Sequence, residues 1–191
     1  MATAKKAAAN AATKAATKAA TKAGTKAATK AATKAAKPAA RKSAKPKDAI
    51  ALLRADHKVV SGLFEDFKTT RSAAKKKALV ASICRELTVH TQIEDEIFYP
   101  AFQAACRDHE LVPEARVEHQ SVKDLIAQVD GAEPDGDDYD AKVNVMGEFV
   151  KHHVKEEHSE MFPKAKASKL DLVALGARML ERKNALMADE G

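Results

Sequence analysis

Apolar residues recur at alternating spacings of three and four in four long segments of the sequence. This spacing places them on one face of an α-helix, the face that is buried when helices pack together. A fifth, shorter segment over about residues 169–187 carries a similar set, and no segment alternates apolar and polar residues as a half-buried strand would. We therefore predict an all-α fold, an up-and-down four-helix bundle with a C-terminal helix packed beside it.

Polar residues interrupt all four apolar stripes, and each helix contributes one histidine. The second and fourth helices add a glutamate four residues later, one turn along the same face. A buried carboxylate without a partner is strongly destabilising, whereas a metal would compensate its charge and use the ring nitrogens. Imidazole and carboxylate ligands suit iron, manganese or zinc. The predicted metal ligands are His57, His90, Glu94, His119, His153 and Glu157.

These six residues form an internal repeat. The two histidines of the first half are 33 residues apart and those of the second half are 34 apart, and each second histidine is followed by a glutamate. We expect two similar helical hairpins, packed around two metal ions that the glutamates bridge. A proline follows each glutamate by six residues, and we expect the two helices to end at Pro100 and Pro163.

Other polar residues near the stripes have simpler interpretations. Glu156 is the alternative to Glu157 as a ligand, but the offset to the following proline favours Glu157. The others are not expected to bind the metal. We expect Asp56, Glu118 and His109 to be exposed. We expect His152 and His158 to lie at the surface or to contact a ligand from outside.

The two cysteines and the apolar content bear on the cellular location. If Cys84 and Cys106 lie on one helix, their 22-residue separation spans roughly 33 Å, too far for a disulfide. Unpaired cysteines fit a reducing cytoplasm. The sequence has no apolar run that could span a membrane and no apolar core of a secretory signal. A transit peptide is the rival interpretation of the acid-poor start. Such peptides favour Arg, however, and the first 47 residues contain one.

The first 47 residues differ sharply in charge from the rest. They hold 13 Lys or Arg and no Asp or Glu, whereas residues 48–191 hold 20 basic and 27 acidic residues, a net charge of −7. The sequence AATK occurs six times between Ala11 and Lys34, once with Gly24 as its second residue. No Leu, Ile, Val or Phe precedes Ile50, so we expect a disordered tail.

A long basic arm without acids favours non-specific binding to DNA phosphates, with affinity gained by counterion release. The tail has no aromatic residue for base stacking, so we expect no sequence preference. Its composition resembles the Ala-Lys-Pro tails of linker-histone-like proteins. A solubilising leader without a partner is the alternative. We thus expect a cytoplasmic protein, held at the nucleoid if the tail binds DNA.

The remainder of the chain resembles the hemerythrin-like domain called the HHE cation-binding domain. The resemblance covers residues 48–165 and rests on the segments ADHKVV, HTQIEDEIFYP, EHQSV and HHVKEEHSEMFP. It implies a four-helix bundle that holds a non-haem, oxo-bridged di-iron centre, with two iron ions. By position, it implies four imidazole ligands, His57, His90, His119 and His153, and two bridging carboxylates, Glu94 and Glu157.

One departure from this family pattern bears on function. Oxygen-carrying hemerythrins use a fifth histidine one turn from the third, but Ala115 and Lys123 stand at those positions around His119. The resemblance is therefore closer to four-histidine proteins of iron-centre repair and of iron or nitric-oxide responses. Ferritin-like bundles use Glu-x-x-His, and no histidine of the chain has a glutamate three residues before it.

Three functions follow from these patterns. The first is a di-iron protein that handles or senses iron, oxygen or nitric oxide and is tethered to DNA by residues 1–47. The second is a histone-like architectural DNA-binding protein whose bundle is mainly structural. The third is a di-iron enzyme that reduces peroxide or nitric oxide. No acid–base pair beside the predicted ligands argues for the enzyme, and we favour a metal-binding role.

Overall fold

The computed structural model describes residues 48–134 and 136–189, so the predicted disorder of residues 1–47 lies outside it and stays a prediction. Every regular element of the described residues is a helix. Among these helices, none combines the length and apolar character needed to cross a bilayer. The order is α1 (Ala49–Thr69), α2 (Ala73–Ile93), η1 (Glu94–Phe98), α3 (Tyr99–Cys106), α4 (Leu111–Val129), α5 (Asp137–Glu156), η2 (Glu157–Met161), α6 (Phe162–Ala167) and α7 (Leu172–Asp189).

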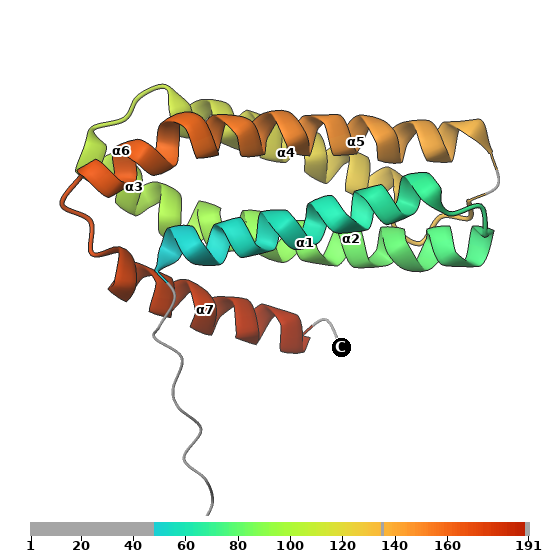
Figure 1. The fold of residues 1–191 in the computed structure, drawn as a ribbon, viewed down its shortest axis with the longest axis horizontal. Coiled ribbons are helices and arrows are strands. Elements are labelled where there is room, and N and C mark those ends of the chain that lie inside the picture. The colour runs from blue at the N-terminus through green and yellow to red at the C-terminus, as the bar shows by residue number, and fades with distance from the viewer. Residues whose placement is uncertain (1–47, 135, 190–191) are drawn as a thin grey trace, which may run out of the picture. The chain divides into compact units, whose positions relative to one another are not determined.

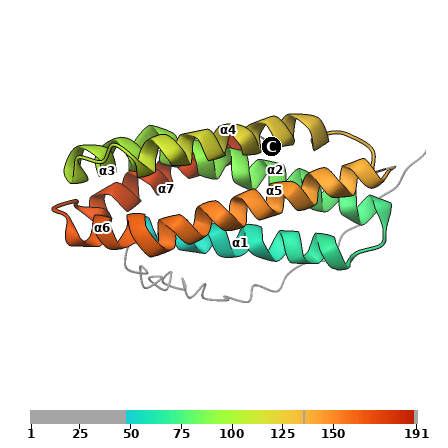
Figure 2. The same cartoon turned by 90° about the horizontal axis from the view of Figure 1, so that it is seen from above.

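Two helical hairpins make the bundle. α1 packs against α2, α4 packs against α5, and contacts of α1 with α5 and of α2 with α4 join the hairpins (Figure 1 and Figure 2). α7 lies outside the four helices, against α1, α2 and η1 (Figure 1). The predicted all-α bundle with an added C-terminal helix is confirmed.

Side-chain caps fix where the first two helices begin. Asp48 Oδ1 accepts a hydrogen bond of 2.7 Å from the Ala51 N–H at the start of α1. Ser72 Oγ accepts one of 3.4 Å from the Lys75 N–H at the start of α2. Both bonds satisfy N–H groups that have no partner within their own helix. The Asp48 cap marks where the bundle begins, and the Ser72 cap closes the short turn between Thr69 and Ala73 that sets α2 alongside α1.

The prolines do not end the second and fourth helices, and this expectation was wrong. The helical path continues through Pro100 to Cys106 and through Pro163 to Ala167. A π-helical turn precedes each proline, with the Tyr99 N–H bonded to the Glu94 carbonyl and Phe162 bonded likewise to Glu157. Each proline then occupies the first turn of a new α-helical segment, where its missing N–H costs nothing.

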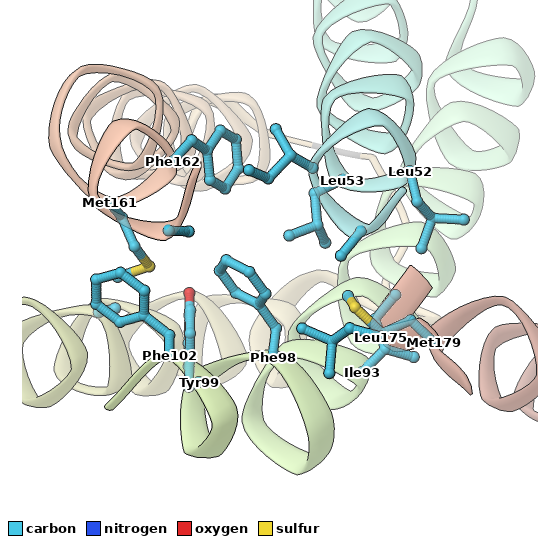
Figure 3. Packing of buried hydrophobic residues seen from close by; sticks show 14 of the residues in the cluster. Leu52, Leu53, Ile93, Phe98, Tyr99, Phe102, Met161, Phe162, Leu175 and Met179 are labelled. Carbon is cyan, nitrogen blue, oxygen red and sulfur yellow. The ribbon is translucent and has the colours of Figure 1, made fainter. Parts of the chain in front are cut away.

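Two apolar clusters fill the bundle on either side of the histidine level. One contains the aromatic rings of η1, α3 and α6, together with Leu175 and Met179 of α7 (Figure 3). The other lies towards the α1–α2 turn and includes Phe64, Ile83 and Met146. A polar layer enclosed between two such clusters is held away from water, which raises the cost of any uncompensated charge in it.

Candidate metal centre

The predicted ligands come together in one buried layer, with exposures between 0% and 6%. In the first hairpin, His57 Nε2 lies 3.0 Å from His90 Nε2. In the second hairpin, His119 Nε2 lies 3.3 Å from His153 Nε2. All four histidines therefore direct the same ring nitrogen to the centre of the bundle.

The two glutamates connect the hairpins. Glu94 Oε2 lies 3.3 Å from His90 Nε2 and 3.4 Å from His119 Nε2. Glu157 Oε2 lies 3.2 Å from His57 Nε2 and 3.8 Å from His153 Nε2. Each glutamate is the first residue of its π-helical turn, a feature often found at functional sites. The donor atoms form two sets within 4.8 Å that share Glu94: His57, His90, Glu94 and Glu157, and Glu94, His119 and His153.

The outward nitrogens of the histidines also face side-chain partners. His153 Nδ1 lies 2.8 Å from Glu118 Oε2, and His90 Nδ1 lies 3.7 Å from Asp56 Oδ2. Asp56 is only 7% exposed and Glu118 is half-buried, so the expectation that both are exposed was wrong. Each precedes the first histidine of its hairpin but orients the second. Such partners fix the tautomer and direction of a metal-binding imidazole.

The remaining two histidines are held by the residues that follow the glutamates. His119 Nδ1 lies 3.3 Å from Asp95 Oδ1, and His57 Nδ1 lies 3.0 Å from His158 Nε2. Burial opposes ionisation of Asp95, but hydrogen bonds from His119 and Lys123 outweigh it and lower the Asp95 pKa to about 2. The two halves of the site therefore differ, because a carboxylate supports one histidine and an imidazole supports its counterpart.

Tyr99 is a buried site residue that the sequence patterns did not reveal. Its hydroxyl lies 3.2 Å from His119 Nε2 and from Glu157 Oε1, and 3.4 Å from His153 Nε2 and Glu94 Oε2. Figure 3 shows the ring between Phe98 and Phe102, with the hydroxyl directed away from its own helix. The two halves of the repeat differ at this position, because Tyr99 precedes Pro100 whereas Phe162 precedes Pro163. A hydroxyl present in only one half is the sequence signal that could have pointed to Tyr99.

Comparison with known proteins identifies the family. The family model described as the hemerythrin HHE cation binding domain matches residues 48–165. The chain belongs to this family. A solved structure of a hemerythrin HHE cation binding domain-containing protein from Mycobacterium kansasii is 26% identical, with a TM-score of 0.64 over 75% of this chain and 89% of that one.

Two curated relatives of this HHE chain say less about its function. One is a much longer protein, and the other is uncharacterized. A DNA nickase from a Nostoc species is 25% identical over 111 residues, which cover 58% of this chain but only 31% of the nickase. An uncharacterized protein of Mycobacterium tuberculosis is 26% identical over 117 residues, 61% of this chain and 71% of that protein. Family membership supports cation binding by the bundle.

The charges within this HHE domain fit a bound cation. Burial and the negative charge of Glu157 raise the pKa of Glu94 well above its ordinary value. Burial also lowers the pKa of His90 to about 4, so its ring is neutral and its nitrogen can act as a ligand. Glu94 Oε1 and Glu157 Oε2 are buried and accept no hydrogen bond. A metal would satisfy both oxygens and remove the repulsion between the carboxylates.

The other polar residues fall where the repeat predicts, outside the centre. His109 and His152 are exposed, as expected, and His158 contacts His57 from outside the centre, which is one of the two places expected for it. Glu156 is half-buried, whereas Glu157 is 1% exposed and lies within the centre. The structure thus favours Glu157 over its neighbour. Cys84 and Cys106 are both free, in agreement with the prediction.

Proposed function

We propose that this chain is a non-haem di-iron protein of hemerythrin-like type that handles or senses iron, oxygen or nitric oxide. The observation that carries the proposal is the convergence of four imidazole nitrogens and two carboxylates in a buried layer. Two donor sets that share Glu94 suit two metal ions bridged by a carboxylate. Iron is favoured because imidazole, carboxylate and the phenol of Tyr99 are ligands it accepts, with manganese or zinc as alternatives.

The space beside the predicted ligands suits a small molecule. A cavity of about 20 Å³ borders all four histidines, and its other walls are mostly aliphatic side chains. This is room for about one water-sized molecule. Those walls include Val60, Leu87, Val122, Val150 and Val154. Iron bound there would supply reversible redox chemistry and a position for a small ligand, while the chain's own residues exclude bulk water and larger substrates.

Reversible oxygen carriage is not part of the proposal. Ala115 and Lys123 stand one turn before and one turn after His119, the two places where the fifth histidine of an oxygen-carrying hemerythrin could lie. The Lys123 ammonium lies 2.9 Å from Asp95 Oδ2 and so takes part in holding the carboxylate behind His119. Lys123 therefore supports the carboxylate behind a proposed ligand, and neither Ala115 nor Lys123 supplies an imidazole.

Metal analysis of the purified, untagged protein tests the proposal. We expect about two iron ions per chain and their loss in the double variant His90→Ala, Glu94→Ala. The matched control His109→Ala, Glu110→Ala changes an exposed pair and should keep both ions. A folded, metal-free wild type after reconstitution with ferrous iron would refute the di-iron proposal and leave the architectural alternative. Peroxide or nitric-oxide consumption by the loaded protein would favour the enzyme.

We also propose that residues 1–47 bind DNA without sequence preference. The support is their 13 basic residues and their lack of acids, beside a remainder of net charge −7. The name of the Nostoc relative refers to DNA, but the match covers 31% of that protein and carries no weight here. Binding of the full chain should weaken steeply with salt. A chain that starts at Asp48 should not bind, and equal binding by both would refute the proposal.

A further inference from the structure

A third group of His and Glu side chains with converging donor atoms lies at the surface beside the inner centre. Glu118 comes from α4, and His152 and Glu156 come from α5. His152 Nε2 lies 3.2 Å from Glu156 Oε1 and 3.6 Å from Glu118 Oε1. One donor atom from each residue falls within 4.8 Å of the others. The spacing of four between His152 and Glu156 repeats the inner pair, one position back along the helix.

The charge around this group favours a cation. Among the described residues, Glu118 and Glu156 form ion pairs only with histidines, and no Lys or Arg lies within ion-pair distance of either. Two carboxylates and one imidazole form a donor set that divalent iron, manganese and zinc accept. Contact with His153 accounts for the place of Glu118, but an exposed pair such as His152 and Glu156 contributes little to stability on its own.

The group can be reached from solvent, unlike the inner centre. The His152 side chain is 60% exposed, and those of Glu118 and Glu156 are 18% and 30% exposed. A surface pocket of about 300 Å³ is lined in part by Glu118 and His152. The six inner ligands are at most 6% exposed. A hydrated ion can therefore bind the outer group without any rearrangement of the bundle.

Glu118 contacts both the outer group and the inner centre. Its Oε1 faces the outer His152, while its Oε2 lies 2.8 Å from Nδ1 of the inner His153. We propose that Glu118, His152 and Glu156 form an outer site for a divalent cation and that this site receives ions on their way to the inner pair. The loading role rests on the proposed two-metal function, whereas the outer site itself does not.

Zinc titration of the metal-free, untagged full chain tests the outer site. Residues 1–47 contain no His, Cys, Asp or Glu and add no competing donors. We expect three ions per chain by calorimetry, of which two remain after gel filtration. The variant His152→Ala, Glu156→Gln should lose the exchangeable ion and keep the other two. The control His109→Ala, Glu148→Gln, also at exposed positions, should bind three.

The rate of loading tests the role of the site. We expect the outer-site variant to fill its two inner positions several-fold more slowly than the control, as followed by zinc transfer from a coloured chelator. Wild type that binds only two ions, or a variant that still binds three, would overturn the outer site. Equal loading rates would overturn its role in entry. Wild type that retains no zinc would instead refute the inner centre, a separate result.

Discussion

Lys183 on the C-terminal helix holds the carboxylate that faces a predicted metal ligand. Its ammonium lies 2.7 Å from Asp56 Oδ1, and Asp56 Oδ2 lies 3.7 Å from His90 Nδ1. Burial opposes the charge of Asp56, but the nearby His90 ring and the ammonium of Lys183 lower its pKa. α7 therefore contributes the positive charge that holds Asp56 beside His90, in addition to the apolar packing of Leu175 and Met179.

Lys183→Met should weaken both the fold and the metal centre. The change leaves the Asp56 carboxylate buried without its cation, and we expect the free energy of unfolding to fall by about 3 kcal/mol. Metal affinity should fall by about 10- to 100-fold, because His90 loses its fixed partner. Denaturant melts of the metal-free protein and metal competition with a chelator measure the two effects. Arg178→Met, at an exposed position of α7, is the control and should change neither.

Tyr99→Phe should alter the metal centre and leave the fold intact. The ring keeps its packing, and the phenyl ring of Phe162 already occupies the equivalent place in the second hairpin. Burial and the charge of Glu157 raise the pKa of Tyr99, so ionisation of its hydroxyl requires a nearby cation. If the phenol binds iron, the loaded wild type absorbs visible light through the iron–phenolate bond and the variant loses that band.

The control for this change is Tyr139→Phe. The Tyr139 hydroxyl is also buried and has no hydrogen-bond partner, but it lies in the other apolar cluster. Its removal should leave the spectrum unchanged. An identical visible spectrum in the wild type and in Tyr99→Phe would show that the phenol is not a ligand.

The positions of the inner histidines and glutamates could be predicted because helix geometry is local. A residue inside an apolar stripe must face the core, and a spacing of four places His90 and Glu94 one turn apart on that face. Four such stripes, each with a histidine, leave one place where the polar side chains can meet. The predicted convergence of all six residues is observed.

The side chains that contact these six residues from outside could not be predicted in the same way. Asp56 and Glu118 are about 100° away from their stripes, and only the neighbouring helix decides whether such a position is covered. Here α7 covers Asp56, while a ring on α5 contacts Glu118. By its spacing, Tyr99 would be predicted as an ordinary apolar core residue. Its hydroxyl reaches the centre from the end of a π-helical turn, which a spacing rule for α-helices does not predict.

Glu94→Gln should have opposite effects on the metal-free and the metal-bound protein. The carboxylate is 0% exposed and repelled by Glu157, so its replacement by a neutral amide should leave the metal-free protein as stable or more stable. The stabilisation that metal adds, about 4 kcal/mol at a thousandfold excess over the dissociation constant, should be lost. Thermal melts with and without metal measure both effects.

The exposed Glu160→Gln is the control for this experiment, and its melts should match the wild type with and without metal. Metal-free Glu94→Gln that unfolds well below wild type would show that the carboxylate already has a stabilising partner inside the protein. A full metal-induced shift in the same variant would show that Glu94 is not a ligand.

The two thiols should differ in reactivity and in their effect at high pH. Burial, together with the charge of Asp130, raises the pKa of Cys84 from 9.0 to about 12. Because the folded state favours the protonated thiol, its contribution to stability is complete below pH 9 and is lost as the pH rises towards 12.

At pH 9, iodoacetamide should therefore modify the half-buried Cys106 and spare Cys84 until denaturant is added. Intact-mass measurements follow both reactions, with Cys106→Ala to isolate the slow thiol. Equal rates in native and denatured protein would show that Cys84 is not protected by burial.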